Sequence, residues 1–238
     1  TGKQLLFRAL DATGQPQPIT SAMTVVRHPA GVGQLLLFGT GRLETGDISD
    51  AQQQSLYVIW DRGEVFPGLL DRADLLARQW LNPQGSDRFI AREVRFDETL
   101  DWHRHQGWFI DWPLSAAAAG AERVINPVQR CGPLLLVLSV APEHCCPVTG
   151  SRWVNLFRIA DGGPPDWPVA DLNADGLIDA QDFENPDGLG LTSPVSYWLR
   201  SDQGLQLIDE GQIEASGARL RSFRLQPMPA AARSTWHQ

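Results

Sequence analysis

Short segments rich in β-branched and aromatic residues recur along the chain, and clusters of Gly, Pro, Asn and Asp separate them. The 22 glycines and 17 prolines among the 238 residues supply many of these turns. Segments with this strand-like pattern are residues 5–10, 24–27, 34–39, 55–61, 88–96, 107–112, 123–127, 134–140, 153–159, 195–198, 204–208 and 218–225. We therefore expect an all-β fold, either a propeller, a sandwich or a barrel.

A pattern that occurs twice favours the propeller. In its first copy, segment 18–26 is followed by a turn and by a hydrophobic strand, 34–41, that ends in glycines. Residues 126–128 and 132–138 repeat this order later in the chain, as the first two strands of a second blade would. The third strands of the two copies are then residues 55–61 and 153–159.

Residues 1–238 are thus expected to form a single, partial β-propeller domain with long insertions. The blades present are too few to close a ring, so we expect the others upstream, or folding on a partner. One insertion carries the only helical pattern, over residues 69–81. Its apolar face would be Leu70, Leu75, Leu76 and Trp80, with Asp71 or Asp74 in the first turn.

A second insertion contains the spacing of a calcium loop, over residues 171–182. Side-chain oxygens stand at loop positions 1, 3, 5, 9 and 12, and Gly176 stands at position 6, where such a loop turns sharply. Leu177 at position 7 would offer its backbone carbonyl, and Ile178 at position 8 would anchor the loop. The predicted Ca²⁺ ligands are Asp171, Asn173, Asp175, Leu177, Asp179 and Asp182.

An acidic, solvated turn is the alternative interpretation of this loop, because Asp, Asn and Gly are common turn residues. Position 12 is Asp182 and not the longer Glu. Dockerin modules share that Asp but carry two such loops, and no second copy occurs here. The flanks 161–168 and 185–190 are turn sequences and not helices. We therefore expect a calcium-loop insertion, residues 161–190, in which the bound ion holds a long connection in place within a non-helical scaffold.

The three cysteines leave the redox state open between two interpretations. One disulfide from Cys131 to Cys145 or Cys146 is favoured, and three reduced thiols are the alternative. Their spacing matches no common zinc finger, although His144 is nearby. The calcium loop supports an extracytoplasmic setting, because millimolar calcium is found there.

Charge and hydropathy exclude two classes of partner. The formal net charge of −8 leaves no basic stripe to neutralise phosphates, so a nucleic-acid partner is not expected. The longest apolar stretch, residues 133–140, fits a buried strand and is too short for a membrane span.

Catalytic motifs are weak or missing, so we expect that the protein is not an enzyme. His103 and His105 could share a face of an extended segment near Asp101 and Asp111, as in a metal hydrolase. A His-x-His pair alone is unspecific, and an exposed loop is the preferred interpretation. The sequence contains neither a Gly-x-Ser-x-Gly elbow nor a phosphate-binding glycine loop followed by Lys.

Several motifs, taken in order, resemble one known family. They are residues 17–22, 27–29 and 37–42 as a blade signature, 55–61 as its following strand, and 107–111, 122–127, Cys145 with 150–153, and 232–237 later in the chain. This order is similar to that of the C-terminal domain of the PilC/PilY family, the adhesin and biogenesis proteins of the type IV pilus tip. The resemblance spans nearly the whole chain.

The resemblance implies the C-terminal portion of a modified β-propeller that is secreted through the periplasm and outer membrane to the cell surface. It also implies binding to minor pilins at the pilus tip, or to a host or surface ligand. Roles in pilus assembly, twitching motility and adhesion would follow. Calcium regulates extension and retraction in the family, and only the positions of loop 171–182 are carried over as ligands.

The alternative function is an extracellular carbohydrate-binding or dockerin-like anchoring module. Its aromatic platform would come from Trp102, Trp108, Trp112, Trp153, Trp167 and Trp198, although such residues more often anchor blades.

Overall fold

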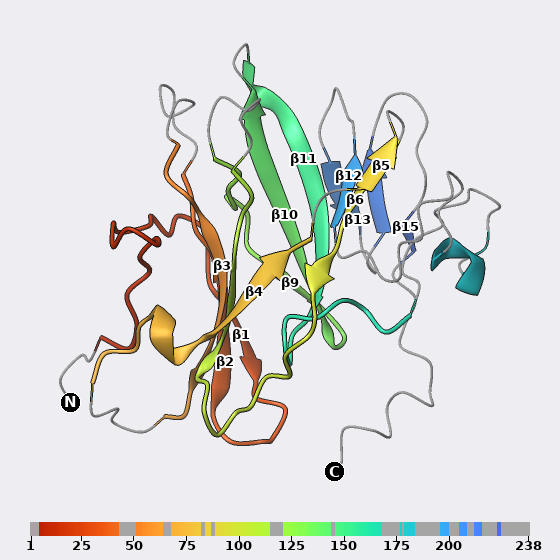
Figure 1. The fold of residues 1–238 in the computed structure, drawn as a ribbon. Coiled ribbons are helices and arrows are strands. Elements are labelled where there is room, and N and C mark those ends of the chain that lie inside the picture. Colours follow the sequence, from red (N-terminus) through yellow and green to blue (C-terminus); the bar gives the residue numbers. More distant parts are fainter. Residues whose placement is uncertain are drawn as a thin grey trace.

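The computed structural model describes residues 5–42, 51–63, 68–81, 84–86, 89–114, 121–143, 146–167, 177, 179–183, 196–199, 205–208, 212–215 and 223–224. Over these residues the fold is all-β, as predicted, with two short 3-10 turns, η2 (Arg72–Asp74) and η3 (Ala180–Phe183). Figure 1 shows the long β10–β11 hairpin beside the first sheet. In the described part of the chain, no helix has the length and apolar character needed to cross a membrane.

The described strands form three sheets. The first has the order β1 (Thr24–Arg27), β2 (Gln34–Gly39), β3 (Ser55–Asp61), β8 (Gly107–Asp111), β4 (Leu76–Trp80) and β7 (Val94–Arg95). The second has the order β5 (Gln84–Ser86), β6 (Phe89–Arg92), β12 (Ser196–Leu199), β11 (Cys146–Arg158), β10 (Leu134–Glu143) and β9 (Gln129–Cys131). The third comprises β13 (Leu205–Ile208), β14 (Gln212–Ala215) and β15 (Phe223–Arg224).

Each of the two larger sheets contains a four-stranded antiparallel meander, as a propeller blade does. In the first sheet, β1, β2, β3 and β8 pair in sequence order. In the second, β9, β10, β11 and β12 pair in the same way. The predicted repeat is therefore present, and strand β4 extends the first blade by pairing in parallel with β8.

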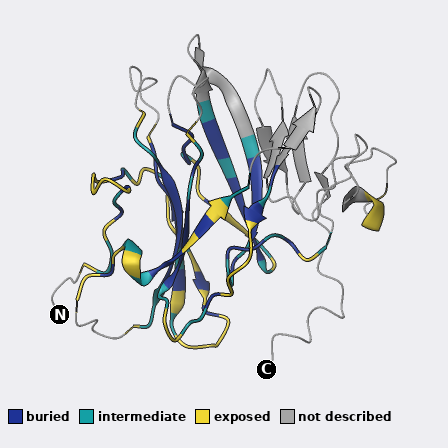
Figure 2. Cartoon of the chain, in the orientation of Figure 1, coloured by how far each residue is buried: buried dark blue, intermediate teal, exposed yellow. Residues whose placement is uncertain are grey.

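One hydrophobic core joins the two large sheets. It combines Leu56 and Val58 of β3 with Leu135 and Val137 of β10, all of them fully buried. Trp108 of β8 is also buried and donates its indole N–H to the carbonyl of Ile159 at 3.0 Å. Burying each such side chain contributes about 1.5–3 kcal/mol, so this core is the main source of stability. The dark ribbon of Figure 2 runs along β3, β10 and β11.

The opposite face of the first sheet is covered by the N-terminal segment, residues 5–18. Phe7 packs against Tyr57 of β3, with ring centroids 5.0 Å apart. The Tyr57 hydroxyl is 2.7 Å from Gln17 Oε1, to which it donates. Arg72 of η2 donates to Asp111 at 2.5 Å and to the Leu10 carbonyl at 3.0 Å, and so ties this segment to β8.

The Gly39-Thr40-Gly41 motif at the end of β2 allows a second segment to approach closely. A Cβ at Gly39 would lie 2.3 Å from Val124 Cβ, and one at Gly41 would lie 2.4 Å from Arg123 Cβ. The Val124 N–H donates to the Thr40 carbonyl at 3.0 Å. The glycines therefore serve packing between the blades.

The predicted helix over residues 69–81 is wrong. Only η2 is helical, where Asp71 accepts from the Ala73 N–H at 2.7 Å in a capping box. The chain then enters β4, in which Leu76 and Arg78 are buried and Ala77 is exposed. Arg78, the buried side chain at the centre of β4, is charged. The alternation of buried and exposed residues along β4 is therefore not recognisable from hydropathy.

Other strand predictions also need correction. Segments 5–10 and 123–127 contain only isolated bridges, such as Phe7 with Leu70 and Arg123 with Val140. Segment 88–96 divides into β6 and β7, which belong to different sheets. Strands β4, β5, β9 and β14 are additional to the predicted segments.

The predicted disulfide from Cys131 is also wrong, because Cys131 has a free thiol. Cys131 lies beside Leu134 and Cys146 lies beside Glu143, at opposite ends of β10. At about 3.3 Å per residue this separation is about 30 Å, far beyond the 7 Å between Cα atoms that a disulfide spans. Cys145 lies outside the described residues.

Candidate calcium loop and its surroundings

The structure describes only part of the predicted calcium loop. Asp171, Asn173 and Asp175 lie outside the described residues. Leu177 and Asp179 are both exposed, and Asp182 lies in η3. The loop is part of the connection from β11 to β12, two strands that are neighbours in the second sheet.

The C-terminal end of the loop begins a helical turn. Asp179 at loop position 9 accepts a hydrogen bond from the Gln181 N–H at 2.8 Å, just before the turn Ala180–Phe183. This is how a carboxylate caps the start of a helix.

The segment that leads into the loop is held by Arg158 at the end of β11. Its guanidinium donates to both carboxylate oxygens of Asp161, at 3.0 and 2.9 Å, and also pairs with Asp166. The Arg158 N–H donates to the Gly163 carbonyl at 2.8 Å. We refer to Arg158, Asp161, Gly163 and Asp166 as the Arg158 latch.

The latch is fixed to the core of the two blades. Arg78 of β4 donates to the Asp161 carbonyl at 2.8 Å, and both Arg78 and Arg158 lie over the ring of Phe96. Gly162, with a φ of +72°, packs against the buried Trp108. These contacts attach residues 158–166 to the core.

The described residues contain no group of three or more His, Cys, Asp or Glu side chains that could hold a metal. His103 is exposed in a turn whose backbone is bonded to Asp101. His28 is buried, accepts from the Ala30 N–H at 3.1 Å, and stacks on Trp60. Burial, assisted by the charge of Arg62, lowers the pKa of His28, so its ring packs as a neutral aromatic group.

Most of the tryptophans proposed for a sugar platform are committed to packing. Trp108 and Trp112 are fully buried. Trp102 packs edge-on against His28, with centroids 4.4 Å apart. The Arg92 guanidinium covers Trp153, 3.8 Å from its ring centroid. Trp198 lies in β12, and its side chain is outside the described part.

Sequence reasoning missed a buried charge network inside the second blade. Arg92 makes two hydrogen bonds to Glu122, at 2.7 and 3.0 Å, and lies between the rings of Trp80 and Trp153. Ser139 donates to the same carboxylate at 2.5 Å. Arg92 and Glu122 are 30 residues apart. Their partnership leaves no local signal in the sequence, whereas a run of apolar residues does.

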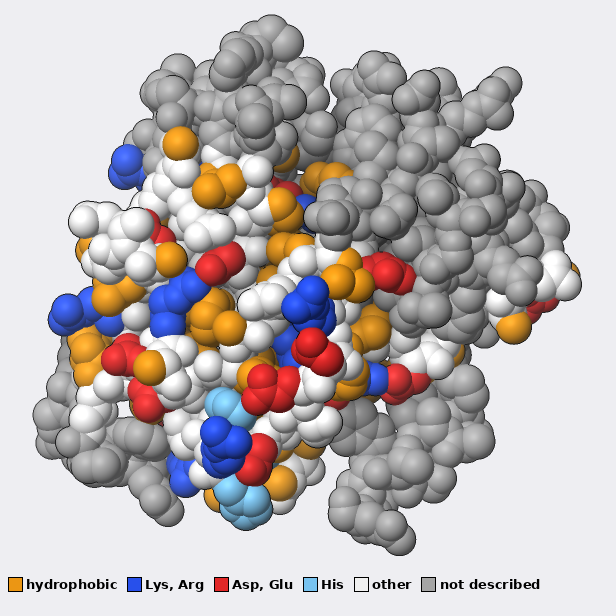
Figure 3. Space-filling model, in the orientation of Figure 1, with side chains coloured by type: hydrophobic (Ala, Val, Ile, Leu, Met, Phe, Trp, Pro, Cys, Tyr) orange, Lys and Arg blue, Asp and Glu red, His pale blue; other side chains and the backbone are white. Residues whose placement is uncertain are grey.

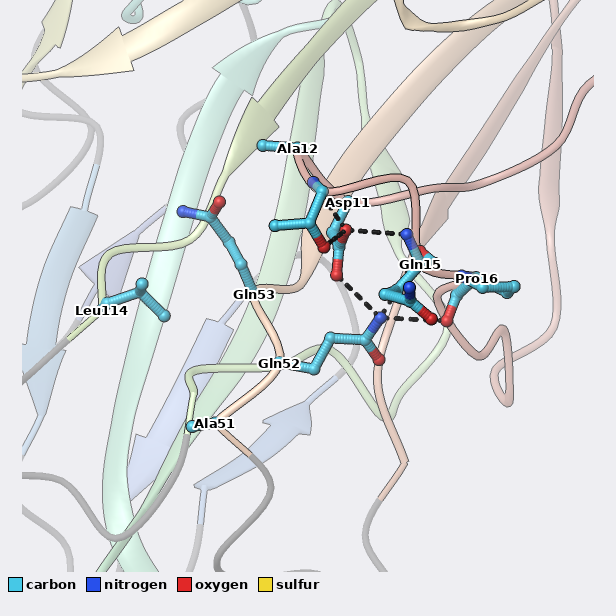
Figure 4. Close-up of a pocket in the computed structure, with 9 residues that line it drawn as sticks. Asp11, Ala12, Gln15, Pro16, Ala51, Gln52, Gln53 and Leu114 are labelled. Atoms are coloured by element: carbon cyan, nitrogen blue, oxygen red, sulfur yellow. Dashed lines mark hydrogen bonds between the residues drawn. The ribbon is translucent and has the colours of Figure 1, made fainter.

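An open pocket of about 540 Å³ lies beside the N-terminal segment (Figure 4). At its wall Asp11 accepts hydrogen bonds from Thr13, Gln15 and Gln52. Burial opposes ionisation of Asp11, but these hydrogen bonds prevail and lower its pKa to about 2. The carboxylate is thus engaged in holding the turn at residues 11–15.

Comparison with known proteins identifies relatives. Residues 1–89 match the PilY1 beta-propeller domain. The chain is 30% identical over 199 residues to the type IV pilus biogenesis factor PilY1 of Pseudomonas aeruginosa PAO1. The aligned region covers 76% of this chain and 17% of that protein. PilY1 of strain UCBPP-PA14 is 27% identical over 218 residues, 78% of this chain and 19% of that protein.

A crystal structure of the P. aeruginosa PilY1 C-terminal domain shares the fold, with a TM-score of 0.72 and 23% identity. The match covers 95% of this chain and 48% of that chain. The chain spans less than a fifth of the length of these two curated relatives.

Proposed function

Because this chain belongs to the PilY1 family, as part of its C-terminal propeller domain, we propose that it acts in type IV pilus biogenesis and surface attachment. The observation that carries this proposal is the propeller fold shared with the PilY1 C-terminal domain over nearly the whole chain. The relatives bear the name of type IV pilus biogenesis factors. The domain would act at the cell surface, at the pilus tip, and contribute to adhesion and twitching motility.

The proposed activity is binding and not catalysis. Its partners would be minor pilins at the pilus tip, or a host or surface ligand. Acidic and basic side chains are interspersed on the face of the molecule in Figure 3. The formal net charge of −8 disfavours a nucleic acid.

Calcium is the proposed regulator of the segment that comes after the Arg158 latch. The ligands would be Asp171, Asn173, Asp175, Asp179, Asp182 and the carbonyl of Leu177. The ion would neutralise four carboxylates that otherwise repel one another, and it would fix the surface that a partner contacts. The capped turn at Asp179 and the anchored leading segment support this arrangement at the two ends of the loop.

Calcium titration by calorimetry tests the ion. We expect saturable one-site binding that Asp175→Ala abolishes, with magnesium as the competing ion. Asp97→Ala, at an exposed position outside the loop, is the matched control and should bind as the wild type does. A wild type that releases no heat and gains no thermal stability with calcium would contradict the assignment.

Co-purification tests the partner. The chain is expected to retain minor pilins in calcium and to lose them in a chelator, and Asp175→Ala should resemble the chelated wild type. Retention on immobilised glycans without pilins would instead support the carbohydrate-binding alternative.

A further inference from the structure

Among the described strands, β1 lies at one edge of the first sheet. It pairs with β2 on one side, in the register Thr24 with Leu37 through Arg27 with Gln34. Among the residues that the structure describes, no strand pairs with its other side. Open edges that carry exposed apolar side chains are sites where further strands add.

The hydrogen-bonding phase of the β1–β2 hairpin shows which backbone groups face outward. The His28 N–H donates to the Gly33 carbonyl, which continues the same register. Bonded and non-bonded pairs alternate in an antiparallel ladder, so Val26 and Thr24 are bonded to β2. The N–H and C=O groups of Val25 and Arg27 therefore point away from β2, toward the open side.

The side chains at this edge form a short row with a defined chemistry. Met23 and Val25 are 43% and 50% exposed, and Arg27 is exposed at the end of the strand. Residues two apart lie on the same face, so the row is apolar, apolar and cationic. Val25 is opposite Leu36, which is itself only partly buried.

The opposite face of β1 is fixed to the core. Val26 is buried in the core between the blades, and Thr24 donates its hydroxyl to the Val128 carbonyl at 2.6 Å. The edge is consequently a preorganised template, which lowers the entropic cost of adding a strand.

We propose that β1 is a docking edge for an extended segment of a partner protein, which adds as a further strand. The segment would form hydrogen bonds with the backbone of Val25 and Arg27. It would carry two apolar side chains and one carboxylate at alternate positions, against Met23, Val25 and Arg27. A second copy of β1 fits less well, because it would offer Arg27 no carboxylate.

Amide hydrogen exchange of the full 238-residue chain tests this proposal. The probe is a short synthetic peptide with Glu, Val and Ile at alternate positions and Thr between them. At saturation, exchange at Val25 and Arg27 should slow roughly tenfold. The Leu36 amide, which already bonds to β3, should not change. Binding without protection at Val25 and Arg27 would place the peptide elsewhere and overturn the proposal.

Two variants make the test specific. Val25→Pro removes an N–H that β2 does not use, so the fold should persist and peptide affinity should fall roughly tenfold. Arg27→Glu should transfer the preference from the Glu peptide to one with Lys in its place. Unchanged affinity in Val25→Pro contradicts the docking edge. Self-association of the chain that protects these same amides would identify a second copy as the occupant and overturn the partner assignment.

Discussion

The buried Arg92–Glu122 pair offers a quantitative test of how the second blade is held together. Arg92 is 2% and Glu122 5% exposed, and the carboxylate accepts from both Arg92 and Ser139. Arg92 also donates to Asn155 of β11 at 3.1 Å. The pair thus connects β6, β10, β11 and the segment before Arg123. Glu122→Gln keeps the shape of the side chain and removes its charge.

Removing one partner of a buried ion pair costs about 3–5 kcal/mol, because the other charge is left without compensation. Gln retains one acceptor oxygen, so we expect a loss of about 3 kcal/mol for Glu122→Gln. In a chain of this size the midpoint of thermal unfolding should fall by about 10 °C. Combining Arg92→Met with Glu122→Leu removes both charges, so the double variant should lose less than the sum of the two single changes.

Urea titration followed by tryptophan fluorescence measures these free energies of unfolding. The matched control is Asp97→Asn, which breaks the exposed Arg95–Asp97 pair and should change stability by less than about 1 kcal/mol. If Glu122→Gln is as mild as this control, or if the two charge removals are additive, the network does not act as a stabilising unit.

Three further measurements concern single sites. Gly162→Ala should cost about 3 kcal/mol in the same titration, because its Cβ would lie 2.6 Å from Trp108 and φ is +72°. Gly14→Ala, at a φ of +83° with open space around it, should cost only about 1 kcal/mol, and equal losses would refute the packing argument. The pKa of Asp11 lies below its unfolded value of 3.8, so the ionised carboxylate contributes about 2 kcal/mol to the free energy of unfolding. This contribution is complete above about pH 4 and is lost as the pH falls to about 2. Asp11→Asn should therefore flatten this part of the curve of stability against pH. Burial raises the pKa of the Cys131 thiol, so a thiol reagent at neutral pH should label Cys131 slowly in the native chain and rapidly in urea, and equal rates would contradict its burial.

The central strands could be predicted from the sequence because their signal is local. β1, β2 and β3 begin and end at the predicted residues 24–27, 34–39 and 55–61. Each is an apolar, β-branched or aromatic run bounded by turn residues, so burial and propensity favour the same structure. The repeat of two blades is visible for the same reason.

The strands and contacts that sequence reasoning missed depend on partners distant in the sequence. β4 has an arginine in its buried row. Arg78 is stabilised there by hydrogen bonds to the carbonyls of Glu98 and of Asp161, the latter 83 residues later. The Arg158 latch combines a strand end with a turn that has the sequence of an ordinary loop. In the sequence, Asp161 and Gly162 cannot be distinguished from residues of a solvated turn. Only the fold places Asp161 against Arg78 and Gly162 against Trp108.

The position of the proposed calcium loop, between two paired strands, determines what the loss of calcium would change. The loop connects β11 and β12, which pair from Arg152 with Leu199 to Asn155 with Ser196. The sheet on one side and the Arg158 latch on the other are held by contacts that include none of the predicted ligands. A chelator should therefore increase hydrogen exchange after Trp167 and leave β10 and β11 protected. If β11 lost protection together with the loop, calcium would be part of the folding core and not a regulator of one surface.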